Sequence, residues 1–552
     1  MWKAGKERNN TKASFPLSTN TKTSAKPVGT RKTFGMTSAI SWDDPTSDEI
    51  RKTNELNKLL ESYGIFETAP ESNHRAAILE KLNQLVKQWI RDVALSKNIL
   101  PSMANKLGGK VFAFGSYLLG VHHRGADIDA LCVVPYSIER SDFFRSLFEI
   151  LKVHSGVTKC LAIEEAFVPV IKMNFEGVEI DLLFSRLDLE TIPDDIDLQN
   201  DKLLRYLDPQ SMRSLNGRRV TEKILKLVPN VDTFRSTLRA IKLWAKNRGI
   251  YSNSVGYFGG VTWAMLVARV CQLYPNAAPA TIIQKFFLIF SMWKWPLPVL
   301  LIPVDDADMG HPVWDPRVNL SDRSHLMPII TPSYPQQNST FNVTESTRKV
   351  IADEFQRGKR ISLEIMQGKS TWDQLLEPPQ FFYKYRHFIA LLANSNTAED
   401  HLKWCGFVEA KLRLLVGNLD RNPQISLAHV HPKCFDMYRH AGKQDSTPSF
   451  CSMWFIGLGI AAVGNSSVNL SDSIQGFVAQ VRSQGEKMIK MGMEIEARYV
   501  KRKELNQYLD SEILKRERRS TEQQTVPLKR KSNEISSQLS KRSRIAGITC
   551  ID

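Results

Sequence analysis

Two aspartates separated by one residue, Asp127 and Asp129, follow eleven residues after a Gly-Ser pair at 115–116. Asp129 is followed by ALCVVP, an apolar and partly β-branched run that predicts a strand ended by Pro135. Alternate residues of a strand share one face, so the two carboxylates point the same way. Anions held this close repel each other unless a cation lies between them. Because most D-x-D pairs are solvated loop or edge residues, the pair alone does not identify the chemistry.

A third carboxylate, Asp181, lies in the otherwise apolar segment VEIDLLF, which is typical of a strand. It follows FVPVIKMNF, and Glu176-Gly177 between the two segments indicates a β-hairpin. A lone carboxylate is costly to bury, whereas three on neighbouring strands can hold a divalent metal, and oxygen ligands favour Mg²⁺. Gly115-Ser116 begins a short helical pattern and predicts a phosphate-binding loop. Together these features indicate a triphosphate bound across two metal ions.

The surrounding segments must supply the elements that position these residues. Residues 44–66 begin with an Asp/Ser-rich N-cap and continue as an amphipathic helix, and 141–154 predict another helix. Helical patterns dominate from 191 to 366, whereas strands and a long helix alternate between 380 and 460. Between the helices expected at 44–66 and 141–154, a further helix carries an apolar stripe formed by Leu79, Leu82, Val86, Ile90 and Val93.

The composition, with 42% hydrophobic and 24% charged residues, is that of a globular protein. A chain of 552 residues is too long for one core and predicts about three domains. There is no run of roughly eighteen apolar residues and no apolar segment behind the basic N-terminus, so neither a membrane span nor a signal peptide is expected. Seven cysteines without a C-x-x-C motif favour a reducing compartment. A soluble intracellular protein is the expectation.

The net charge of +16 is concentrated at the two ends of the chain. Residues 1–37 carry +7 and residues 501–552 carry +6, which leaves about +3 for the long middle. Both ends are polar, and disorder is expected there. In the second, the clusters at 529–531 (KRK) and 541–544 (KRSR) have the spacing of a bipartite nuclear-import signal. Nonspecific attraction to RNA is the alternative explanation of these clusters.

Motifs along most of the chain resemble those of the nuclear poly(A) polymerases of eukaryotes, within the nucleotidyltransferase superfamily typified by DNA polymerase β. The motifs are FGSY..GVH..GADIDALCV, FVPVIKMNF.G.EIDLLF, RSLNGRRVTEKIL.LVPN, RAIKLWAKNRGIYSN..GYFGGVTWAMLVARVCQLYPN, WDPRVN.SDR.HLMPIITPSYPQQNST and LAHVHP. The resemblance covers roughly residues 40 to 500 and is much more specific than any single motif.

This resemblance implies an α/β plus α fold with three domains. They are a nucleotidyltransferase catalytic domain with a mixed sheet (76–190), a helical middle domain (38–75 with 191–366) and an RRM-like α+β RNA-binding domain at the C-terminal side (367–500). A disordered basic segment (1–37) and a basic tail with the import signal (501–552) are expected to flank them.

The resemblance also implies roles for individual residues. The catalytic, metal-binding carboxylates are Asp127, Asp129 and Asp181. The nucleotide-binding residues are Phe114, Gly115 and Ser116 at the phosphates, Lys242, Lys246 and Tyr251 at the triphosphate, Asn216 at the incoming nucleotide, Gly260 and Val261 under the adenine, Thr331 at its edge, and His123.

His123-Arg124 departs from the Thr-Lys of mammalian members, so a side-chain contact at His123 is open. The long Ser/Thr-rich extension of vertebrate relatives is absent, so its regulatory role is not carried over. His429, His431, Cys434 and His440 have zinc-binding side chains, but the first two match a metal-free domain of the family.

The activity implied is template-independent addition of AMP from ATP to the 3′ end of pre-mRNA. The expected cofactor is Mg²⁺, two ions per site, with Mn²⁺ as a substitute. The expected partners are ATP, the RNA 3′ end, cleavage and polyadenylation factors and importin, with no membrane, for a monomer in the nucleus. A uridylate- or CCA-adding transferase and an inactive RNA-binding scaffold are the alternatives. The retained aspartates, Gly-Ser pair and lysines argue against the scaffold, while Asn216, Val261 and Thr331 argue against another base.

Overall fold

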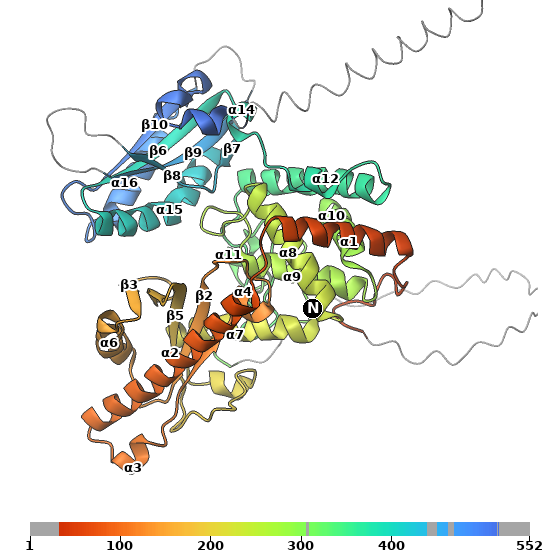
Figure 1. The fold of residues 1–552 in the computed structure, drawn as a ribbon. Helices are drawn as coiled ribbons and strands as arrows, with labels where there is room; N and C mark the ends of the chain where they lie inside the picture. The colour runs from red at the N-terminus through yellow and green to blue at the C-terminus, as the bar shows by residue number, and fades with distance from the viewer. Residues whose placement is uncertain (1–32, 305–308, 439–449, 462–467, 516, 518–552) are drawn as a thin grey trace, which may run out of the picture. The chain divides into compact units, whose positions relative to one another are not determined.

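The computed structural model describes residues 33–304, 309–438, 450–461, 468–515 and 517 (Figure 1). Every element below lies in one compact unit that begins at Phe34. The expected disordered segment at the N-terminus, apart from its last residues, and the basic clusters of the tail lie outside the described residues. Within the described ranges, no helix has the length and apolar character needed to cross a membrane.

The first sheet has five strands in the order β1-β2-β5-β4-β3. The strands are β1 (Lys110–Ala113), β2 (Ile128–Val134), β3 (Val157–Ile163), β4 (Val170–Phe175) and β5 (Val178–Arg186). The pair β2–β5 is parallel and the other pairs are antiparallel, which confirms the expected mixed sheet. The predicted hairpin is also confirmed, because β4 and β5 are joined at Glu176 (φ 48°) and Gly177 (φ 87°).

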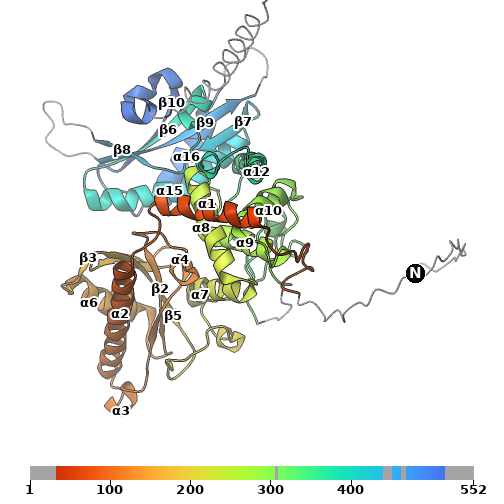
Figure 2. The ribbon, with the colours of Figure 1, turned by 45° about the vertical axis from the view of Figure 1, so that its right-hand side comes forward.

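Both faces of this sheet are covered, which explains why β2 is a continuous apolar run. One face packs against α2 (Ala69–Ser96), as Figure 2 shows, and against η1 (Phe143–Leu147) and α6 (Phe148–Val153). The predicted apolar stripe of α2 lies in this core. The other face, with Leu131 and Val133, packs against α7 (Pro209–Leu227) and the segment that precedes it. Asp129 shares that second face, since side chains alternate along a strand. Three short helices complete this part: α3 (Pro101–Ala104), α4 (Gly115–Leu119) and α5 (Arg140–Asp142).

Helices dominate the middle of the chain, as the sequence predicts. They are η2 (Asp201–Leu204), α8 (Val231–Asn247), α9 (Gly260–Leu273), α10 (Pro279–Met292), α11 (Leu320–Arg323), α12 (Glu345–Met366) and α13 (Trp372–Leu376). Their core contains Trp244, Trp263 and Phe355, which are fully buried and in mutual ring contact. The predicted N-terminal helix, α1 (Ser47–Ser62), packs on this core: Trp372 Nε1 donates to the carbonyl of Lys52 at 3.0 Å.

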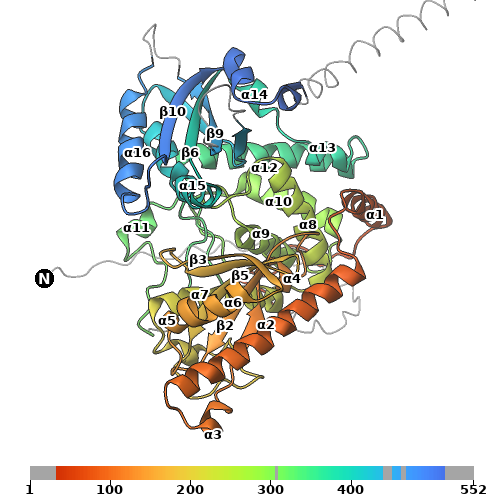
Figure 3. The same cartoon turned by 60° about the vertical axis from the view of Figure 1, so that its left-hand side comes forward.

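The second sheet is antiparallel, in the order β10-β6-β9-β7, and β8 pairs with β9. Its strands are β6 (His387–Ser395), β7 (Ile425–Val430), β8 (Phe435–Tyr438), β9 (Phe450–Ile460) and β10 (Glu494–Lys501). The helices α15 (Ala398–Asp420) and α16 (Ser471–Gln484) pack beside this sheet (Figure 3), and α14 (Phe381–Lys384) precedes it. This arrangement confirms the expected α+β domain.

The chain stays packed on this second sheet beyond residue 500. After β10 it forms η3 (Arg502–Gln507), and Leu505 and Leu509 are buried in the core. Glu517 Oε2 accepts a hydrogen bond from the backbone N–H of Phe382 at 2.9 Å. Ordered structure therefore continues into the segment expected to be a basic tail. The domain boundaries taken from the sequence stay a prediction.

Candidate active site

A cavity of about 990 Å³ lies among α4, the start of β2, and the helices α7, α8 and α9. It is lined by all but one of the predicted site residues, namely Phe114, Gly115, Ser116, His123, Asp127, Asp129, Asn216, Lys242, Lys246, Tyr251, Gly260, Val261 and Thr331. Asp181 is the exception. Residues from four separate helices, the strand β2 and the loops between elements thus converge on one space, which is large enough for a nucleotide.

Asp181 lies beside the cavity, because it is the direct partner of Asp129 in the parallel pair β2–β5. Asp129 is largely buried, and burial together with the charges of Asp127 and Asp181 raises its pKa to about 7. The ammonium of Lys172 pairs with the carboxylate of Asp181 across the antiparallel pair β4–β5. The motifs of the sequence did not single out Lys172. Counting outward from the two-residue turn at 176–177 places it opposite Asp181, so the signal was present.

Gly115 brings the phosphate-loop backbone against Asp129. Its φ is 59°, in the left-handed region that favours glycine, and a Cβ built there would lie 2.0 Å from Asp129 Oδ2. The N–H of Gly115 donates to Thr221 Oγ1 of α7 at 3.3 Å, a contact the sequence did not suggest. The helix that follows, α4, has five residues, so its dipole is small. The loop is suited to bind an anion mainly through close backbone approach.

Lys242 and Lys246 lie one turn apart on α8 and both line the cavity. Lys242 is 8% exposed, so it does not belong to an ordinary solvated helix face. Burial, followed by the charge of Lys246, lowers the pKa of Lys242 to about 8, against the opposing effect of Asp127 and Asp129. Its Nζ donates to the carbonyl of Val121 at 3.2 Å. These two cations line the same cavity as Asp127 and Asp129, and their positive charge suits a polyanion.

The remaining predicted residues form the less charged part of the cavity wall. Val261 is 39% exposed although it is apolar and lies in the first turn of α9. The Oδ1 of Asn216 is buried without a hydrogen-bond partner among the described residues. Thr331 Oγ1 accepts from the N–H of Gln337 at 2.9 Å, and burial raises the pKa of Tyr251 to about 12, so its phenol stays protonated and can donate. An apolar surface with polar groups at its edge suits a nucleobase.

A buried ion pair that the sequence did not reveal supports the backbone leading into Asp127. Arg75 of α2 donates Nη2 to the carbonyl of Ala126 at 2.5 Å and also pairs with Glu67. Glu67 Oε2 lies 2.8 Å from His122 Nε2. Arg75 and Glu67 are eight positions apart, but their partners Ala126 and His122 lie about fifty positions further along the chain, so no local pattern predicts these contacts.

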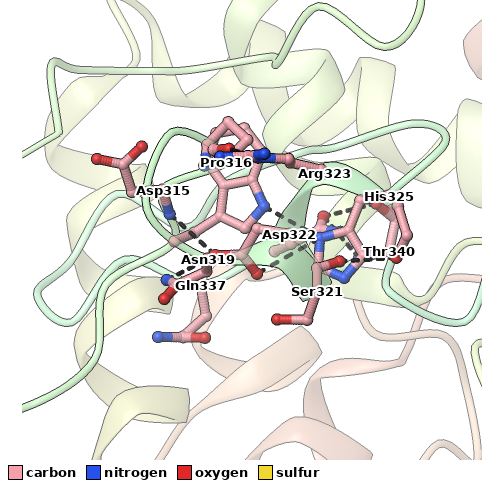
Figure 4. A network of polar contacts seen from close by, with 12 residues as sticks. Asp315, Pro316, Asn319, Ser321, Asp322, Arg323, His325, Gln337 and Thr340 are labelled. Carbon is pink, nitrogen blue, oxygen red and sulfur yellow. Dashed lines mark hydrogen bonds and ion pairs between the residues drawn. The ribbon is translucent and has the colours of Figure 1, made fainter.

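A loop rich in side-chain hydrogen bonds closes another side of the cavity (Figure 4). Asp322 Oδ2 accepts from the N–H of Asp315 and from Nδ2 of Asn319, both at 3.0 Å. Trp314 donates Nε1–H to His325 Nδ1 at 3.0 Å, and both residues line the cavity. The network holds residues 314–325 together as one ordered loop, from which Trp314 and His325 line the cavity.

The three aspartates have the donor chemistry of a site for an oxygen-preferring divalent cation. Burial, followed by the charges of Asp127 and Asp181, raises the pKa of Asp129, and a bound cation would offset both effects. Across the described ranges, no three His, Cys, Asp or Glu side chains are arranged closely enough to hold one metal ion, and the carboxylate of Asp181 is paired with Lys172. The three aspartates nevertheless have suitable oxygen donors and an excess of negative charge. Asp127, Asp129 and Asp181 thus fit a divalent metal by the chemistry of their oxygen atoms and by their charge.

The two described histidines of the alternative zinc cluster, His429 and His431, have other hydrogen-bond partners. The buried His429 uses Nδ1 in a hydrogen bond with the Tyr385 hydroxyl at 2.7 Å. The Nδ1 of His431 accepts from the N–H of Lys433 at 3.1 Å. His440 lies outside the described residues. Among the described residues, no three His, Cys, Asp or Glu side chains near His429, His431 and Cys434 are placed to hold a metal ion.

Three family models together match most of the chain. Residues 35–228 match the poly(A) polymerase nucleotidyltransferase domain, 233–378 the poly(A) polymerase central domain, and 380–444 with 437–519 the poly(A) polymerase predicted RNA binding domain.

Curated relatives are similar over comparable lengths. A poly(A) polymerase of Dictyostelium discoideum is 43% identical over 87% of this chain and 60% of its own length. Nuclear poly(A) polymerase 1 of Arabidopsis thaliana is 40% identical over 86% of this chain and 66% of its own length. Poly(A) polymerase PAPa of Candida albicans is 45% identical over 73% of this chain and 73% of its own length. The chain thus spans slightly less than two thirds of the length of the first two. A solved structure of the Cid1 poly(U) polymerase has a TM-score of 0.40 at 14% identity, covering 60% of this chain and 99% of that one, too distant a likeness to support an argument.

Proposed function

Because the chain belongs to the poly(A) polymerase family, we propose that it adds AMP from ATP to the 3′ end of RNA without a template, with release of pyrophosphate. The pre-mRNA 3′ end is the proposed cellular substrate. The observation that carries the proposal is that two lysines and two aspartates line one cavity of about 990 Å³. Cations that bind phosphate oxygens and carboxylates that can hold a divalent metal, together in one cavity, suit a triphosphate that reacts at its α-phosphate.

The triphosphate would lie between α8 and the phosphate loop. Lys242 and Lys246 would bind its oxygens, and the protonated phenol of Tyr251 would donate a third contact. Gly115 and its neighbours Phe114 and Ser116 would approach the phosphates with the backbone. Holding the ATP and the primer end in one orientation removes much of the entropic barrier to their reaction.

The primer 3′-OH would attack the α-phosphate, and Asp181 would accept its proton. Members of this family generally use divalent metal ions. We propose that Asp127, Asp129 and Asp181 hold two Mg²⁺ ions, with Mn²⁺ as a substitute. When bound, such ions activate the attacking hydroxyl and stabilise the charge on the leaving pyrophosphate. The ammonium of Lys172 pairs with Asp181.

Adenine would be selected by the less charged wall. Gly260 and Val261 would form a flat surface beneath the base, with Asn216 and Thr331 at its polar edges. A buried hydrogen-bonding edge rejects a base that leaves it unpaired, so base choice depends on these few contacts.

The part of the chain after residue 380 would bind RNA, since it matches a predicted RNA binding domain. The similarity to a nuclear relative and the two basic clusters in the tail support nuclear location with import by an importin. Recruitment of a monomer by cleavage and polyadenylation factors completes the proposal.

The test offers the purified chain an oligo(A) primer, Mg²⁺ or Mn²⁺, and each of the four NTPs separately. We expect extension chiefly with ATP, loss of extension in Asp129→Asn, and normal extension in Asp92→Asn, whose carboxylate is exposed on α2. Equal incorporation of UTP would place the chain among uridylyltransferases. Primer binding without incorporation of any nucleotide would identify an inactive scaffold.

A further inference from the structure

The hydrogen bonds of His123 determine which ring nitrogen carries the proton. Its Nδ1 lies 3.0 Å from the carbonyl oxygen of Arg124, which can only accept, so Nδ1 is the donor. Its Nε2 lies 2.6 Å from Nζ of Lys246, an ammonium that can only donate. Nε2 therefore accepts, and the ring is neutral. Burial and the charges of Lys246 and Lys242 lower the pKa of His123, which favours the same state.

Lys246 is consequently held in place before any nucleotide arrives. One ammonium hydrogen points at His123, and the ammonium lies 5.4 Å from the centroid of the Tyr251 ring. An ammonium has three hydrogens, so donors remain for another acceptor in the cavity that Lys246, His123 and Tyr251 all line. His123 itself belongs to the loop between α4 and Asp127, the loop whose Val121 carbonyl also binds Lys242.

We propose that His123 is a positioning residue that presents the ammonium of Lys246 to the triphosphate. The inference rests on the proposed function, because it assumes that a triphosphate occupies this cavity. A free lysine side chain loses several rotatable bonds when it binds a phosphate, and a lysine already held by a neighbour loses less. His123 acts through Lys246 and needs no contact with the ligand.

The proposal is tested by calorimetric binding of ATP and of inorganic tripolyphosphate to the full chain in the presence of a metal chelator. The loss of one hydrogen bond to a charged group predicts that His123→Ala raises both dissociation constants about 10-fold. Binding of adenosine, which has no phosphate, should not change. His123→Gln restores an acceptor oxygen at a similar reach and should recover most of the affinity.

A double-mutant cycle with Lys246→Met distinguishes positioning from direct contact. If His123 acts only through Lys246, His123→Ala adds no further loss in the Lys246→Met background. An undiminished 10-fold loss in that background would show that His123 contacts the phosphates itself and would overturn the inference. Unchanged tripolyphosphate binding in His123→Ala would also overturn the inference. If the wild type still binds tripolyphosphate and extends primers, the proposed function is unaffected by that result. A wild type that binds neither ligand and adds no AMP would overturn both.

Discussion

Replacing Gly115 with alanine tests whether the close approach of the phosphate loop to Asp129 is required. Gly64 provides a matched control, because its φ of 61° is close to the 59° of Gly115 while no atom lies within 4 Å of the Cβ position. A left-handed alanine costs about 1–2 kcal/mol at either position. Both variants should therefore lose similar stability from the backbone alone.

The two variants should differ in activity. At Gly115 the new Cβ would lie 2.0 Å from Asp129 Oδ2 and 3.0 Å from its Cγ, so rotation of the carboxylate alone cannot relieve the contact. The carboxylate must shift by about 1 Å or more, and a displacement of this size can cost on the order of 100-fold in rate. We expect Gly115→Ala to reduce the rate of AMP incorporation about 100-fold at saturating ATP and primer.

The assay measures this rate and urea unfolding for wild type, Gly115→Ala and Gly64→Ala. Gly64→Ala should keep nearly full activity. If the two variants lost stability equally and extended primers equally well, Asp129 would not need its observed position and the argument for the loop would fail.

Other properties of the site lead to three further predictions. The pKa of Asp129 is about 7 in the folded chain and about 3.9 in the unfolded chain, so between these pH values the folded state binds one proton more. With a chelator present, the free energy of unfolding should therefore fall as the pH rises from about 4 to 7. Asp129→Asn should flatten this dependence of the unfolding free energy, and equal slopes in the two proteins would contradict the shift. ATP should be preferred over other NTPs by at least ~10-fold, because an unpaired buried polar group costs about 1–3 kcal/mol. Asn216→Ala should reduce the ratio of AMP to other nucleotides incorporated in competition. An unchanged ratio would exclude Asn216 from base selection. Removal of residues 520–552 spares Glu517, which accepts a hydrogen bond from Phe382. This truncation should preserve extension at saturating primer and move a tagged protein from the nucleus to the cytoplasm. An inactive but nuclear product would show that the tail acts in catalysis.

Local patterns in the sequence were sufficient for the parts of the site whose geometry depends on neighbours in the chain. The run after Asp129 predicted β2, and the two-residue turn at 176–177 predicted the hairpin that carries Asp181. The spacing of Lys242 and Lys246 placed both on one side of α8. These predictions succeed because strand alternation, turn register and helical periodicity are set within a few residues.

The tertiary structure alone decided which distant groups meet and what their environment does to them. The parallel pairing of β2 with β5 sets Asp129 beside Asp181, and burial there shifts the pKa of Asp129. His123 contacts Lys246 across more than one hundred residues. Such contacts arise from the packing of whole elements, and the cost of removing a charge from water depends on everything that surrounds it, which no local pattern encodes.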